Sequence, residues 1–191
     1  GNTHTRLCKC GASETKDHEF GEEEIVLQPT DNSIHAKSVC SICGYERDVV
    51  AAGTVVNFTN CEGLNTNPLT FVQSGDEATF TLKLPTADDI DAREGYKLVG
   101  WIASIDGVSY SAGTELFIAY ADASTITFTA EWAAIIGTGE QKLAANVPYT
   151  TDMDAFELEG EGIIYQGDQV FYVPKDGIYV LIESKNDEEV E

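Results

Sequence analysis

The chain has 191 residues, of which 42% are apolar and 9% aromatic, which is enough hydrophobic side-chain volume for a packed core. Its 33 Asp and Glu against 11 Lys and Arg give a net charge of -22, spread along the sequence. Because nucleic acids and anionic membranes are bound through clustered Lys and Arg, neither is expected as a partner.

Membrane insertion is not expected within the chain either, since no apolar run approaches the roughly 20 residues that cross a bilayer. The chain opens without the charged and then apolar stretch of a signal peptide, so for an exported protein we expect that segment to have been removed. Residues 186–191 are acidic with almost no apolar content and are expected to form a solvated tail.

The first 50 residues contain all three His and four of the five Cys. Cys40 and Cys43 have the spacing of a zinc knuckle, in which two thiolates share one tight turn and the following glycine, Gly44, relaxes the backbone. A second half-site lies at Cys8 to Gly11, so a tetrahedral ion could be completed across the intervening loop.

This segment resembles the Cys-Gly and His-x-aromatic repeats of large surface proteins from anaerobic gut bacteria, in the residues Cys10-Gly11, His18-Glu19-Phe20 and Cys40 to Gly44. It departs from them in a Cys-x-Cys spacing, which makes it difficult for Cys8 and Cys10 to reach the same ion. The expected ligands of a structural zinc are therefore Cys10, His18, Cys40 and Cys43, with Cys8 and His35 as alternates.

Two other interpretations of these cysteines remain open: disulfides in an exported protein, or reduced and buried thiols. A catalytic zinc fits less well, because such sites usually leave one coordination position open, whereas four ligands rich in thiolate close the shell.

The next segment alternates apolar and polar residues with the two-residue period of a strand, at 55–58, 79–84 and 125–130. After Pro85 the sequence predicts one short helix, capped by Thr86, with Asp88 and Asp89 in its first turn and Gly95 at its end.

The stretch from Gly95 to Trp132 contains Gly-Tyr, Gly-Trp and a terminal Trp in an order that resembles the Listeria-Bacteroides repeat, the B-repeat of internalin-type surface proteins. The resemblance covers Val55 through Trp132 and implies a small β-grasp-like fold with strands over one short helix. Trp101 and Trp132 are expected in its core, because each can bury a large area.

The last segment, from residue 134, is predicted to contain three strands in a meander between Gly162 and Ile182, including one at Val170–Val173. Its aromatic residues are expected to pack in a core more than to form a binding strip; they are Tyr165, Phe171, Tyr172 and Tyr179.

The expected fold class is mainly β with minor α (α+β), in three parts: a zinc-ribbon-like segment (1–50), a B-repeat-like β-grasp module (51–133) and a small antiparallel β domain (134–191). The chain lacks the nucleophile-elbow, phosphate-loop and His-Glu-x-x-His motifs. Cys61 has no His near it in sequence and is interpreted as incidental.

The sequence therefore predicts a non-catalytic, secreted or cell-surface bacterial module for adhesion, display or protein–protein interaction. The alternative is a module that binds carbohydrate or peptide, and a hydrolase or hydrolase accessory domain stands behind both. The partner, a protein or a glycan, and the oligomeric state have no local signature in the sequence.

Overall fold

A computed structural model of the chain describes residues 2–7, 10, 13–28, 30, 33–120, 124–159, 163–166 and 169–184. The protein is mainly β, as the sequence predicted, and no helix within the described ranges reaches seven residues. In the same ranges no helix has the length and apolar character needed to cross a membrane.

Two compact units make up the chain. The first comprises Gly1–Val56, Pro68–Phe80 and Ile118–Ile126, and the second comprises Asn57–Asn67, Thr81–Phe117 and Thr127–Glu191. The division into domains at residues 50 and 133 stays a prediction. The strand β12 (Thr125–Ile135) continues through the second of these positions.

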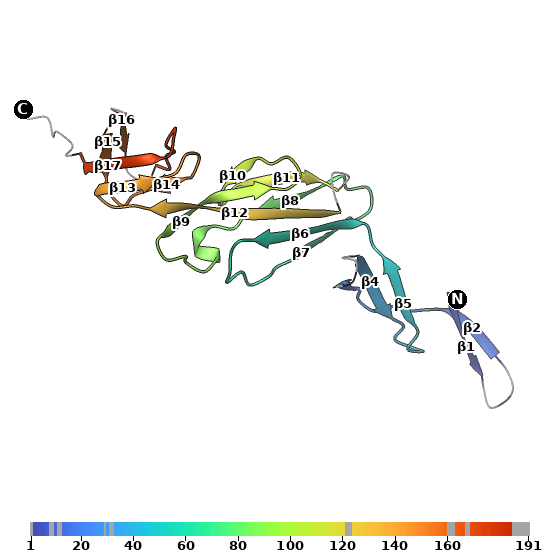
Figure 1. Cartoon of the computed structure of the whole chain (residues 1–191). Coiled ribbons are helices and arrows are strands. Elements are labelled where there is room, and N and C mark those ends of the chain that lie inside the picture. Colours follow the sequence, from blue (N-terminus) through green and yellow to red (C-terminus); the bar gives the residue numbers. More distant parts are fainter. Residues whose placement is uncertain are drawn as a thin grey trace, which may run out of the picture. The chain divides into compact units, whose positions relative to one another are not determined.

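The N-terminal part of the first unit is built from two small antiparallel sheets (Figure 1). One is the hairpin of β1 (Thr3–Leu7) and β2 (Ser13–Asp17). The other has the order β3-β4-β5, with bounds Glu24–Leu27, Ile34–Val39 and Glu46–Val50. Alternate residues of β4 are buried, which is the pattern of a strand with one face covered.

The largest sheet has the strand order β10-β9-β12-β6-β7, with β14 also paired to β12. Its strands are β6 (Gly53–Thr59), β7 (Leu69–Val72), β9 (Tyr96–Ala103), β10 (Ser109–Ser111), β12 and β14 (Tyr149–Thr150). A two-stranded sheet joins β8 (Thr79–Lys83) and β11 (Glu115–Ala119). The strands predicted at 55–58 and 125–130 are confirmed as parts of β6 and β12, and the one predicted at 79–84 is confirmed as β8 apart from its last residue.

Trp101 lies at the centre of the core of the second unit and is 0% exposed, which confirms its predicted role. Its indole Nε1–H donates a 2.8 Å hydrogen bond to the carbonyl of Pro85, and the Phe58 ring meets it edge-on with centroids 5.0 Å apart. The neighbouring Gly100 is required by packing, because a Cβ there would clash with the carbonyl oxygen of Tyr110 on β10.

The helix predicted after Pro85 is a three-residue 3-10 helix, η1 (Ala87–Asp89). The Asp89 carboxylate accepts hydrogen bonds from the backbone N–H of Thr86 at 2.8 Å and from its hydroxyl at 2.7 Å. These two hydrogen bonds stabilise the single turn from Thr86 to Asp89. At Ile90 the chain is already extended, so the prediction of a helix reaching Gly95 is wrong.

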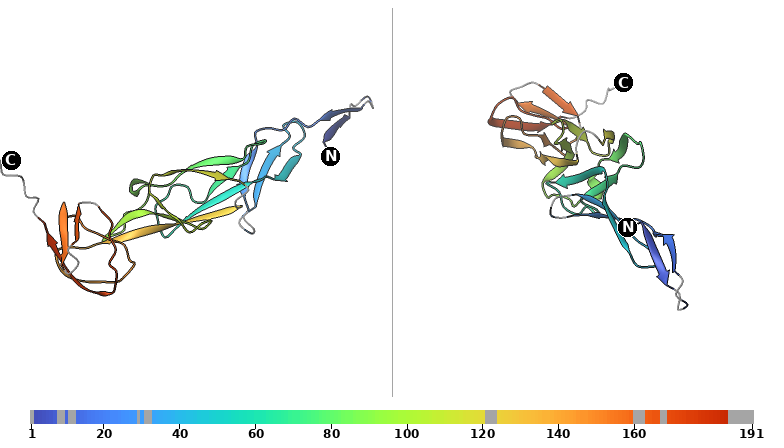
Figure 2. Two further views of the ribbon diagram at one scale, coloured as in Figure 1. Left: turned by 90° about the horizontal axis from the view of Figure 1, so that it is seen from above. Right: turned by 90° about the vertical axis from the view of Figure 1, so that its right-hand side faces the viewer.

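The C-terminal strands form a four-stranded antiparallel sheet of order β13-β17-β15-β16, shown in orange and red in Figures 1 and 2. Their bounds are Gly139–Leu143, Ala155–Glu159, Ile163–Gln166 and Gly177–Glu183 for β13, β15, β16 and β17. The core of this region is formed by Leu143, Tyr149, Phe156, Leu158, Phe171, Val173, Tyr179 and Leu181.

Of the three strands predicted for the meander, the first and the last are present as β16 and β17, but the middle one is not, and both pair with β15 instead. Val170–Val173 is not a strand; Phe171 and Val173 make only isolated bridges, to Tyr149 and Ala145. A strand that was not expected from the sequence, β15, lies between β16 and β17, with Phe156 and Leu158 buried and Glu157 and Glu159 exposed.

The aromatic side chains of this region differ in burial. Phe171 and Tyr179 are in the core as predicted, whereas Tyr172 is 48% exposed. The predictions for the Tyr165 side chain and for the acidic tail fall outside the part of the chain that the structure describes.

Candidate metal centre

Two of the four side chains of the candidate centre come from the β1–β2 hairpin. His4 is in β1 opposite Lys16, and His18 follows the last residue of β2, with its N–H bonded to the carbonyl of Asn2 at 3.0 Å. Because side chains two positions apart along a strand share a face, this register places both imidazoles on one face of the hairpin. Their ring centroids are 5.4 Å apart.

The other two side chains come from the turn between β4 and β5. The N–H of Gly44 donates to the carbonyl of Cys40 at 2.9 Å, and the N–H of Cys40 donates to the carbonyl of Tyr45 at 2.9 Å. Gly44 has a φ of 73°, a left-handed conformation that glycine adopts without strain. The turn thus brings the sulfurs of Cys40 and Cys43 to one side, as the knuckle spacing predicted.

The hairpin and the turn meet through the backbone. Phe20 forms a bridge with Cys40, and the N–H of Ser41 donates to the carbonyl of Glu19 at 2.9 Å. This contact brings His4, His18, Cys40 and Cys43 together, with one ligand atom from each lying within 4.8 Å of the others.

The distances suit a tetrahedral ion. With Zn–S near 2.3 Å and Zn–N near 2.0–2.1 Å, the ligand atoms of such a site lie about 3.3–3.8 Å from one another. The Sγ of Cys43 and the Nδ1 of His18 are 3.2 Å apart. A small contraction of the group therefore gives four-coordinate geometry, and the cluster could hold a metal.

Burial at the centre is uneven. Cys40 is 1% exposed and Cys43 is exposed, while both ring nitrogens of His4 are shielded from solvent and have no hydrogen-bond partner among the described residues. Leaving a buried polar group unpaired costs about 1–3 kcal/mol, and a metal bond to either nitrogen would remove part of that cost. The rings of Phe20 and Tyr45 flank His18 at 5.5 and 4.6 Å.

The electrostatic surroundings of Cys40 favour its thiolate. Burial alone raises the pKa of the thiol, but hydrogen bonds from the backbone of Ile42 and Cys43 and from the side chains of His18 and Cys43 outweigh it and lower the pKa from 9.0 to about 6. Cys40 is thus poised as a thiolate, the form that binds metals.

The sequence-predicted ligands are only partly brought together. His18, Cys40 and Cys43 belong to the group, and His4 is its fourth member, whereas Cys10 is exposed and stands outside it. His35 instead bonds the carboxylate of Asp48 at 2.6 Å through Nδ1 and the hydroxyl of Ser33 at 3.0 Å through Nε2. Cys8 lies outside the described residues.

His4 was not among the ligands expected from the sequence. The missing signal was the hairpin, since pairing 3–7 with 13–17 puts His4 and His18 on one face. The disulfide alternative finds no support at Cys40, Cys43 or Cys61, which are all thiols in the structure.

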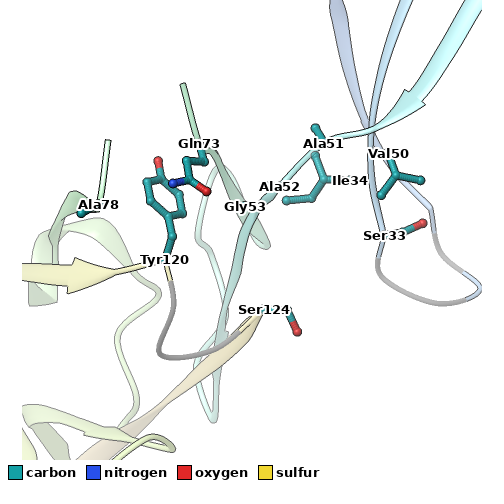
Figure 3. Close-up of a pocket in the computed structure, with 10 residues that line it drawn as sticks. All are labelled: Ser33, Ile34, Val50, Ala51, Ala52, Gly53, Gln73, Ala78, Tyr120 and Ser124. Atoms are coloured by element: carbon teal, nitrogen blue, oxygen red, sulfur yellow. The ribbon is translucent and has the colours of Figure 1, made fainter. Parts of the chain in front are cut away.

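A different hollow of about 580 Å³ in the first unit is shown in Figure 3. None of its ten lining residues carries a charge. Tyr120 closes one side, with its hydroxyl bonded to the carbonyl of Val72 at 3.1 Å. This hollow offers no metal ligands and no acid–base pair, so we assign it no chemistry.

Comparisons of the chain with protein-family models, with curated proteins and with solved structures found no match. The metal centre is therefore assessed from its own geometry.

Proposed function

We propose that the protein is a non-catalytic module of the bacterial cell surface or extracellular space, used for adhesion or display, whose N-terminal part is fastened by a structural zinc ion. The ligands of that ion are His4, His18, Cys40 and Cys43. The observation that carries the proposal is the convergence of these four donors, from two separate segments, within 4.8 Å.

A structural role for the ion follows from where the ligands lie. Two belong to the β1–β2 hairpin and two to the turn after β4, so the ion would link elements that otherwise share few bonds. The five residues of β2 are all exposed, and β1 contains only one that is half-buried. A hairpin with so little apolar burial is marginal without an additional link.

Zinc is the metal that this donor set favours. Two thiolates and two imidazoles in a tetrahedron are typical of structural zinc, whereas magnesium and calcium require oxygen ligands. Four protein ligands leave no open position for water or substrate, which supports a structural and not a catalytic ion.

The display role draws on different evidence. The net charge of -22 favours solubility and disfavours non-specific association, which suits a module displayed on a cell. The resemblance of residues 55–132 to the B-repeat supports the same class, and makes a β-grasp-like arrangement with minor α the expected fold of that part.

The first experiment is the zinc content of the purified full chain, measured by native mass spectrometry. We expect about one zinc per chain, lost in Cys43→Ser and in His4→Ala because each removes one of four ligands. Cys61→Ser and Cys10→Ser are the matched controls and should retain the ion.

Zinc retained in His4→Ala but lost in Cys10→Ser would assign the fourth ligand to Cys10. A chain that binds no zinc, with its thiols oxidised, would contradict the proposal and favour disulfides.

The display role is tested separately, in the source cells. Antibodies raised against the chain should label intact cells or detect the protein in the medium. Signal only after the cells are permeabilised would contradict a surface role.

A further inference from the structure

The second unit contains two adjoining hollows of about 540 and 270 Å³. Both are lined by the segment Asp91–Arg93 and by Trp132, so these residues form a shared wall. The larger hollow lies in the 300–1,000 Å³ range of small-ligand sites. The metal centre contributes no residue to either hollow.

The indole of Trp132 is held in a fixed position at this wall. Its Nε1–H donates to the carbonyl of Asn60 at 2.9 Å, and the Asn60 side-chain amide donates to the carbonyl of Ala130 at 2.8 Å. Asn60 has a φ of 59°, which is uncommon for a residue other than glycine. The ring is thus preorganised while remaining half-buried, next to open space.

The charged side chains that line the larger hollow form no ion pair or hydrogen bond with one another. The carboxylates of Glu62 and Asp91 make no ion pair or hydrogen bond within the described part of the chain, although the Arg93 guanidinium lines the same hollow. Arg93 instead lies over the ring of Tyr96 at 4.4 Å and near that of Trp132 at 5.9 Å. Two acidic residues, an arginine and a tryptophan therefore line one cavity.

This combination distinguishes between ligand classes. A cationic ligand would seek the aromatic rings and the carboxylates, but Arg93 already lies against both rings and would repel it. An anionic ligand would meet two unpaired carboxylates. A neutral ligand with an apolar face and many hydroxyl groups can pack on the indole while it donates to the carboxylates and accepts from the guanidinium.

We propose that this wall is a carbohydrate-binding site, with a neutral sugar ring in the larger hollow against Trp132 and a second ring in the smaller hollow. Trp132 supplies the packing surface, and Glu62, Asp91 and Arg93 supply the hydrogen bonds. The site would give the module a neutral oligosaccharide as its ligand, independently of zinc.

Trp132 and Cys61 make the test specific to this site. Because Trp101 is 0% exposed, quenching of tryptophan fluorescence by acrylamide reports on Trp132. The probes are cellotriose, maltotriose, xylotriose, mannotriose and chitotriose, with trilysine as a cationic counter-probe. At least one trisaccharide should protect Trp132 from acrylamide and slow the alkylation of Cys61, which lines the larger hollow, as followed by peptide mass spectrometry.

Matched variants distinguish this site from non-specific binding. Glu62→Gln and Arg93→Ala should each weaken the binding of that trisaccharide about tenfold, because each removes a charged hydrogen-bond partner. Glu157→Gln and Arg47→Ala, which change the same residue types outside the hollows, should leave it unchanged. The zinc-free Cys43→Ser variant should bind the sugar normally, so this test and that of the zinc site can fail separately.

The proposal is overturned if none of the five trisaccharides binds more tightly than about 10 mM, or if binding survives both pocket variants. Protection by trilysine that is lost in Glu62→Gln would likewise overturn it, since the site would then recognise a cation.

Discussion

At the scale of single residues, the two tryptophans show how burial sets the role of an identical side chain. Both indole N–H groups donate to a backbone carbonyl, Trp101 to Pro85 at 2.8 Å and Trp132 to Asn60 at 2.9 Å. Trp101 is fully enclosed, whereas Trp132 is half-buried and borders two hollows. Sequence alone made both of them core residues.

Trp101→Phe should lower the free energy of unfolding by about 2–4 kcal/mol, because it leaves a cavity and removes the hydrogen-bond donor of the half-buried Pro85 carbonyl. Trp132→Phe removes a comparable hydrogen bond from a half-buried position and should cost about 1 kcal/mol. Urea unfolding of the two variants measures both values. Equal losses would contradict the assignment of Trp101 as the centre of the core.

The metal centre was predictable where its signal was local. Cys40 and Cys43 were indicated by their spacing on one turn, and His18 by the resemblance to the Cys-Gly and His-x-aromatic repeats. The identification of His4 as a ligand depends on the strand register, which pairs His4 with Lys16 across the hairpin. The sequence offered Cys10 as a chemically equivalent substitute, and only the hairpin geometry favours His4.

At the scale of elements, the turn between β9 and β10 depends on one carboxylate. Asp106 accepts a 2.6 Å hydrogen bond from the hydroxyl of Tyr110 and a 2.9 Å bond from the N–H of Val108. The Tyr110 hydroxyl first, and the Val108 amide second, hold the pKa of Asp106 below its ordinary value of 3.8. The same bond raises the pKa of Tyr110.

The sign of the pH dependence follows from that shift. The folded chain binds this proton less readily than the unfolded chain, so the stabilisation is complete above pH 3.8 and is lost as the pH falls through the lowered pKa. Tyr110→Phe should raise the pKa of Asp106 towards 3.8, as seen by NMR titration of the carboxyl carbon. Tyr172→Phe is the control, and a similar rise there would rule out the direct hydrogen bond as the cause.

Predictions of elements succeeded where a strand is dense in β-branched and aromatic residues, as in β8 and β12. They failed where tertiary contacts decide. Val170–Val173 has the composition of a strand, but its Phe171 is buried in the core and the segment forms only isolated bridges. The strand in this sheet is β15, although it contains two exposed glutamates. The helix after Pro85 is one turn long: the Thr86–Asp89 bonds cap its start, and the chain is extended at Ile90, whose side chain is buried.

At the scale of the whole molecule, the metal centre and the proposed sugar site belong to different units. The hairpin that carries His4 and His18 has almost no buried apolar surface, whereas the second unit encloses Trp101 and Phe128 completely. The stability of the hairpin should therefore depend on an ion, and that of the strands around Trp101 on hydrophobic burial.

Removal of zinc should act on the first unit alone. After chelation, hydrogen–deuterium exchange should rise at least tenfold at 3–7, 13–17 and 40–45, because the link between hairpin and turn is lost. Exchange at 96–103 and 127–135 should stay unchanged, since those strands are held by the Trp101 core. Cys43→Ser should reproduce the effect without a chelator, and Cys61→Ser should not. An equal rise in both units would mean that the ion supports the whole fold, and unchanged exchange at the hairpin would mean that the four side chains have no structural ion.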